Sequence, residues 1–187
     1  KSKPLMQELR NLWGLLLKHG MRIVPVYIRS SDNVLADAAS RMCAPRDYAL
    51  KREVFLHIMK LWGCCTVDAF ASPVTAQLRR FWTHPQQGGG EARDAFAQAW
   101  RVEKVFVHPP PSALSRVVEM LLFEGAEAVV ICPTWRATPW FGVLQSLATH
   151  TWDLPQGSLR RVAADAPQNV ERWQVSAMLI PRRPPLL

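Results

Sequence analysis

The chain of 187 residues has few cysteines, fewer acidic than basic residues and no long hydrophobic run. Its four cysteines show no Cys-x-x-Cys spacing and no histidine pair completes a zinc set, so we expect reduced, buried thiols and no zinc site. No apolar stretch approaches the roughly 20 residues that a membrane-spanning helix needs, so we expect no membrane. The first residue is Lys1 and no signal-peptide pattern follows it, which favours a segment of a longer reading frame.

The basic charge is concentrated at the two ends of the chain, although the formal net charge is +8 overall. Residues 1–52 hold ten Lys and Arg against four Asp and Glu, residues 53–153 hold eight against nine, and residues 154–187 hold five against two. A basic balance favours a polyanionic partner, so we expect nucleic acid to contact the ends. The candidate phosphate contacts are Arg160, Arg161, Arg182 and Arg183, and the alternative for each is a solvated surface arginine.

Helical and strand-like patterns alternate along a sequence that is 49% hydrophobic. We expect helices at 5–16, 34–42, 50–62, 112–124 and 138–147, the fourth of them capped by Ser112, and a turn with a short helix at 72–82. We expect strands at 22–29, 65–70, 104–108, 127–132 and 173–180. The strand at 127–132 is a short apolar run, which is typical of a strand buried on both faces. This alternation predicts an α/β fold with a mostly parallel sheet. Ligands of such sheets bind beyond the carboxyl ends of the strands, so Asp68–Phe70 and His108–Pro111 are candidate site segments.

The first resemblance lies in the N-terminal unit. A strand-like stretch is followed by N-V-L-A-D-A-A-S-R and a proline-containing linker at 43–47. This string resembles the C-terminal end of the ribonuclease H domain of retrotransposon reverse transcriptases. By that resemblance residues 1–42 are a helix-strand-helix remnant, and Asp37 matches the family's last metal-binding carboxylate. Two-metal hydrolysis needs several converging carboxylates, so we expect this remnant to be inactive.

The second resemblance extends over about 80 residues. The motifs VDAFAS, DAFAQAW, KVFVHPPPS and EAVVICPTWRATPWF follow one another between residues 67 and 141. Together they resemble the phage-type Dam family of DNA adenine-N6 methyltransferases. A related domain follows ribonuclease H in the polyproteins of DIRS-type tyrosine-recombinase retrotransposons. The resemblance implies a Rossmann-like methyltransferase domain at 48–181, followed by a basic, proline-rich tail at 182–187.

The Dam resemblance implies S-adenosylmethionine as the cofactor and assigns the site residues. Asp68 and Phe70 match positions near the cofactor, and the segment His108, Pro109, Pro110 and Pro111 matches the motif that holds the target adenine. In the family an Asn or Asp stands where this chain has His108, and an aromatic residue stands at Pro111. Stacking of a base on an aromatic ring contributes roughly 1–3 kcal/mol, so we expect a degenerate site.

Three functional hypotheses follow. The first is a retrotransposon-derived polyprotein fragment whose degenerate methyltransferase-like module binds nucleic acid, with the upstream reverse transcriptase and ribonuclease H as protein partners. The second is a co-opted structural or RNA-binding subunit of a ribonucleoprotein, and the third is an active methyltransferase. All three imply an intracellular protein, in the nucleus or in a ribonucleoprotein particle. Several aromatic residues are candidate base-stacking platforms, although we expect most of them in the core: Trp82, Trp100, Trp135, Trp140 and Phe141.

Overall fold

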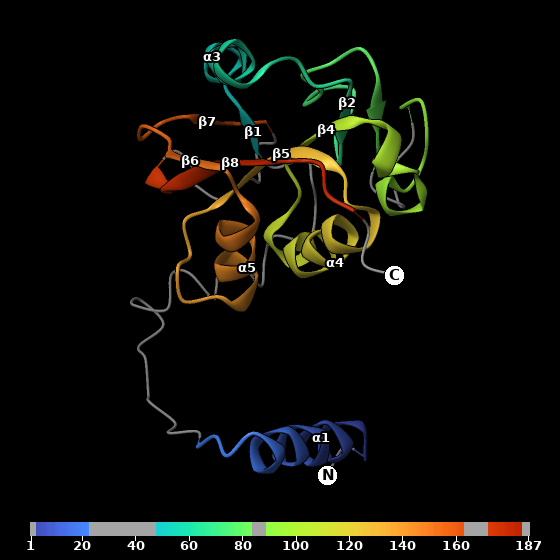
Figure 1. The fold of residues 1–187 in the computed structure, drawn as a ribbon, viewed down its shortest axis with the longest axis vertical. Coiled ribbons are helices and arrows are strands. Elements are labelled where there is room, and N and C mark those ends of the chain that lie inside the picture. The colour runs from blue at the N-terminus through green and yellow to red at the C-terminus, as the bar shows by residue number, and fades with distance from the viewer. Residues whose placement is uncertain (1–2, 23–47, 84–88, 163–171, 185–187) are drawn as a thin grey trace. The chain divides into compact units, whose positions relative to one another are not determined.

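The computed structural model describes residues 3–22, 48–83, 89–162 and 172–184, and it divides into compact units at 1–34 and 35–187. The first unit contains helix α1 (Lys3–Lys18), which confirms the helix expected there (Figure 1). Gly20 follows it in a left-handed conformation with φ 61°, as expected for a residue that ends a helix. The expected strand at 22–29 lies outside the described residues except for Arg22. The expected helix carrying Asp37 and the expected linker at 43–47 lie entirely outside the described residues.

The second unit is built on a six-stranded sheet with the order β3-β2-β4-β5-β8-β6. Its strands are β2 (Val67–Ala69), β3 (Phe81–Trp82), β4 (Lys104–Val107), β5 (Glu127–Pro133), β6 (His150–Asp153) and β8 (Val175–Ile180). The pairs β2–β3, β2–β4 and β4–β5 are parallel, whereas β8 runs antiparallel to both of its neighbours. The prediction of an α/β fold with a mostly parallel sheet is therefore confirmed.

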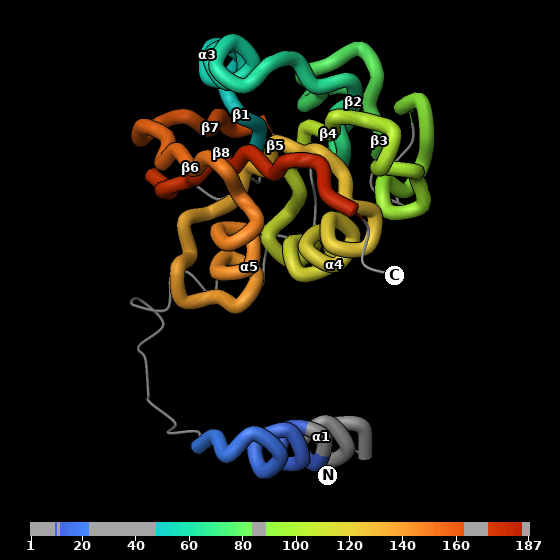
Figure 2. Tube along the Cα trace, viewed as in Figure 1, coloured from blue at the N-terminus to red at the C-terminus, as the bar shows by residue number. Residues whose placement is uncertain are grey.

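Both faces of this sheet are covered. Helix α3 (Arg52–Trp62) lies on one side, while α4 (Leu114–Glu124) and α5 (Pro139–Leu147) lie on the other (Figure 2). A two-stranded antiparallel sheet of β1 (Tyr48–Leu50) and β7 (Leu159–Arg161) adjoins the α3 side. Side chains of β5 alternate between the two cores, with Val129 packed on the α3 side and Val130 on the α4 side. The expectation that β5 is buried on both faces is thus confirmed.

Three local expectations are wrong. Residues 72–82 form a turn and strand β3 instead of a turn and a short helix, because Phe81 and Trp82 pair in register with β2. The third helix begins at Arg52, since the residues before it pair with β7. Ser112 does not cap α4, because it lies within a 3₁₀ turn, Pro111–Ala113, that precedes the helix.

Candidate functional site

The strand order creates a switch point between β2 and β4. From β2 the chain continues to β3 on one side, and from β4 it continues to β5 on the other, so the connections leave in opposite directions. Ligands of open α/β sheets bind at the carboxyl ends of the strands at such a point. Asp68 is in register with Phe106, and Ala69 with Val107. The structure therefore brings together the two strand ends that the sequence singled out.

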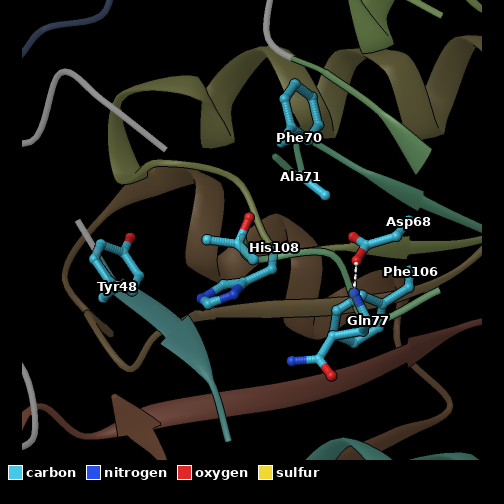
Figure 3. Close-up of a pocket in the computed structure, with 8 residues that line it drawn as sticks. Tyr48, Asp68, Phe70, Ala71, Gln77, Phe106 and His108 are labelled. Atoms are coloured by element: carbon cyan, nitrogen blue, oxygen red, sulfur yellow. Dashed lines mark hydrogen bonds between the residues drawn. The ribbon is translucent and has the colours of Figure 1, made fainter. Parts of the chain in front are cut away.

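A small pocket lies at this switch point (Figure 3). Its lining residues are Tyr48, Asp68, Phe70, Ala71, Thr75, Gln77, Phe106 and His108. The cavity volume is about 10 Å³, which is close to the smallest space that holds one water molecule. The site is thus nearly filled by the chain itself.

Asp68 is engaged with the segment that follows its own strand. Its side chain is buried, and its Oδ2 accepts a hydrogen bond of 2.7 Å from the backbone N–H of Gln77 (Figure 3). Burial raises the pKa of Asp68 to about 7, and the hydrogen bond from Gln77 only partly opposes that rise. Asp68 is therefore a buried carboxyl group that loses its proton less readily than an exposed aspartate, and its hydrogen-bond donor belongs to the same chain.

The segment from Ser72 to Gln77, here called the covering loop, lines the pocket and is fixed by hydrogen bonds to β1, α3 and β7. The Gln77 Nε2 donates to the carbonyl oxygen of Leu50 at 2.7 Å. Arg52 donates to the backbone oxygen of Gln77 and to its Oε1. Arg160 on β7 donates to the carbonyl oxygen of Val74 at 3.2 Å. The covering loop is consequently held by groups that are far from it in sequence.

Phe70 lines the pocket, but its ring lies in the core. It packs edge-on against Phe96 at a centroid distance of 4.7 Å and against Trp100 at 6.1 Å, and only 1% of the residue is exposed. Figure 3 shows the ring directed away from His108. The backbone of Phe70 has φ 65°, a conformation that favours glycine. A bulky residue thus occupies a backbone geometry that the residue type alone does not predict.

His108 follows β4 at the opposite side of the pocket. Its ring lies edge-on to Tyr48 at 5.3 Å, and Tyr48 in turn meets Trp173 at 5.6 Å. Burial lowers the pKa of His108 to about 4, so the imidazole is neutral near pH 7. The prolines that complete this motif, Pro109, Pro110 and Pro111, are buried, and Pro111 begins the 3₁₀ turn before α4.

Sequence reasoning missed Tyr48, Gln77 and Trp173. Tyr48 lies 60 positions before His108 in the chain, and only the pairing of β1 with β7 brings it to the pocket. Gln77 contacts Leu50, which lies 27 positions earlier in the chain. No local pattern marks these residues, because each depends on contacts between distant segments.

The four candidate phosphate-binding arginines are exposed, and they lie on two segments. Arg160 and Arg161 belong to β7. Arg182 donates to the carbonyl oxygens of Arg101 and Glu103, and Arg183 donates to that of Leu147, so the residues after β8 are tied to the domain. Contact of the four arginines with nucleic acid stays a prediction.

The remaining metal, thiol and aromatic expectations have mixed outcomes. Asp37 lies outside the described residues, and within the described ranges no three His, Cys, Asp or Glu side chains are grouped to hold a metal ion. Cys65 and Cys132 are buried thiols, as expected, whereas Cys64 is exposed. Three aromatic residues, Trp82, Trp100 and Phe141, are buried as expected. Trp135 and Trp140 are half-buried.

Comparisons with known proteins add no assignment. No family model matches the chain, and neither curated proteins nor solved structures match it. Among the described helices none is long and apolar enough to cross a membrane.

Proposed function

We propose that residues 48–181 are a methyltransferase-like module that binds nucleic acid and does not transfer methyl groups. The observation that carries the absence of methyl transfer is the filled switch point, where the side chain of Asp68 accepts a hydrogen bond from Gln77 of the covering loop. We further propose that the chain derives from a retrotransposon polyprotein, with an upstream reverse transcriptase and ribonuclease H as protein partners. The order of the two resemblances along the chain supports that origin.

The residues at the switch point do not fit S-adenosylmethionine in this arrangement. Pockets for ligands of that size have volumes of roughly 300–1,000 Å³, whereas this cavity measures about 10 Å³. The backbone N–H of Gln77 already uses one oxygen of Asp68, and the Phe70 ring packs in the core. Pro111 offers no aromatic face for a target base. We therefore derive no methyl-transfer step.

Nucleic acid is the partner that the charge favours. The net charge is +8, and several exposed arginines lie at or near the carboxyl edge of the sheet and on β7. These are Arg136, Arg160, Arg161 and Arg172. Phosphate contacts by such side chains supply affinity that does not depend on sequence. Such contacts do not require the methyl-transfer chemistry, because a fold can host different functions.

Calorimetric titration with S-adenosylmethionine tests the absence of cofactor binding. The expected result is no saturable heat up to about millimolar cofactor, which corresponds to a binding free energy weaker than about −4 kcal/mol. D68A is the matched variant, because it removes the acidic group that the Dam resemblance places near the cofactor. Saturable binding at micromolar cofactor that disappears in D68A would overturn the proposal.

Two alternatives each have one observation in their favour. The adjacency of Asp68 and the strand before His108 favours an active adenine methyltransferase, which incorporation of labelled methyl groups into DNA would reveal. The exposed apolar side chains of α1 favour a co-opted structural subunit, since such residues bind protein partners. These are Leu12, Trp13, Leu15 and Leu17, of which Leu17 is 77% exposed.

A further inference from the structure

Two arginine–tryptophan pairs meet at one end of the sheet. Strand β5 ends at Pro133, which is in register with Val175 at the start of β8. The pairing continues by one step, because the N–H of Thr134 donates to the carbonyl oxygen of Gln174 at 3.0 Å. The next residues on the two segments are Trp135 and Arg136 on one side and Trp173 and Arg172 on the other. These four residues are here called the arginine–tryptophan rim.

The rim combines accessible aromatic faces with positive charge. Both tryptophans are half-buried, and both arginines are exposed. Among the described residues, Trp135 packs in neither of the two core clusters, and its ring lies 6.2 Å from that of Trp140. Trp173 packs partly against the core on the α3 side, so core packing explains part of its position. Core packing does not explain the position of Trp135.

The rim is continuous with the switch point. Trp173 contacts Tyr48, and Tyr48 contacts His108, so aromatic rings connect the rim to the pocket. Tyr48 is buried and touches both neighbours edge-on, so the rings that bases can reach are the half-buried Trp135 and Trp173. Unpaired bases stack on aromatic rings of this kind while the nucleic-acid backbone follows neighbouring positive charge. In a duplex the base faces are covered by their neighbours, so stacking of this kind favours single strands.

We propose that the arginine–tryptophan rim binds single-stranded nucleic acid, with bases on Trp135 and Trp173 and phosphates at Arg136 and Arg172. This inference rests on the proposed function, since it names the class of nucleic acid and the surface that binds it. Arg136 also pairs with Asp153 at 2.8 Å. Both partners of this pair are substantially exposed, and exposed ion pairs are weak, so a phosphate competes for the guanidinium.

Fluorescence anisotropy with labelled oligonucleotides tests the rim. The probes are oligo-dT, oligo-U and a duplex of equal length, compared with one another at the same salt concentration and each titrated over a series of salt concentrations. We expect the single strands to bind more tightly than the duplex, and W135A and W173A each to weaken single-strand binding by about 5- to 150-fold. R136Q and R172Q are each expected to reduce the salt slope by about 0.7.

W152A is the matched control, because Trp152 is also half-buried but lies on β6 against His57. It is expected to leave the affinity unchanged. W135F and W173F keep a ring and are expected to retain most of the affinity, and the melting temperature of each variant reports its folding. If W135A and W173A bind as tightly as the wild type, or if the protein prefers the duplex, the proposal that the rim binds single strands is wrong, while the proposed function stands. Absence of binding to all three probes would overturn both.

Discussion

Replacing Asp68 by Asn is expected to stabilise the folded protein at about pH 8 by up to about 4 kcal/mol, and to have little effect at about pH 4. Burial raises the pKa of Asp68 from 3.8 to about 7. Between these two values the unfolded chain has lost the proton that the folded chain keeps, so stability falls as the pH rises. Asn keeps an oxygen that accepts the hydrogen bond from Gln77 but carries no charge.

His108 provides the opposite dependence. Burial lowers its pKa from 6.5 to about 4, so between these values the unfolded chain carries a proton that the folded chain lacks. Its contribution to stability therefore rises with pH over that window, and it opposes that of Asp68. Relative to the wild type, D68N is expected to gain a positive slope of about 1.4 kcal/mol per pH unit, and H108Q a negative slope of similar size.

Urea unfolding of the wild type, D68N and H108Q at a series of pH values measures both slopes. Comparison with the wild type removes the contributions of the other titrating groups. If D68N destabilises the protein equally at both ends of the pH range, burial does not raise the pKa of Asp68, and this account of the carboxyl group is wrong.

The second large effect is expected at Phe70. Removing its buried ring in F70A is expected to lower the free energy of unfolding by about 3–5 kcal/mol. Because φ is 65°, alanine is strained there, and F70G is expected to be about 1 kcal/mol more stable than F70A. This order reverses the usual one, in which glycine within an ordered strand or helix is less stable than alanine.

Phe106 gives the matched comparison. It is fully buried on β4, and its φ is not among the positive values. F106G is therefore expected to be less stable than F106A by about 0.5–1 kcal/mol. Urea unfolding of the four variants checks both orders, and an F70G that is less stable than F70A would show that Phe70 is not held in the left-handed conformation.

Local patterns were enough to predict most of the helices and long strands. Leu114, Val117, Val118 and Leu121 recur at helical spacing, and α4 buries these residues. The continuous apolar run in β5 predicted burial on both faces, which its alternating contacts confirm. The two candidate site segments were found because strand ends in an α/β sheet meet at one edge.

The parts that could not be predicted depend on distant contacts. Strand β3 has only two residues and exists through its pairing with β2. The covering loop is held by hydrogen bonds from Arg52 on α3 and Arg160 on β7. Both residues are distant from the loop in sequence, so no local pattern predicts these contacts. Phe70 has a positive φ, which is rare for a bulky residue, so its residue type does not predict this backbone conformation. Its ring packs in the core against Phe96, a contact that the local sequence does not reveal.

The most direct measurement of the central claim is the affinity for a labelled single strand from about 50 to about 300 mM salt, with and without S-adenosylmethionine. A nucleic-acid-binding module with a closed cofactor site predicts saturable binding that weakens steeply with salt and does not change when the cofactor is added. Binding that is absent at low salt, independent of salt or strengthened by the cofactor would contradict it.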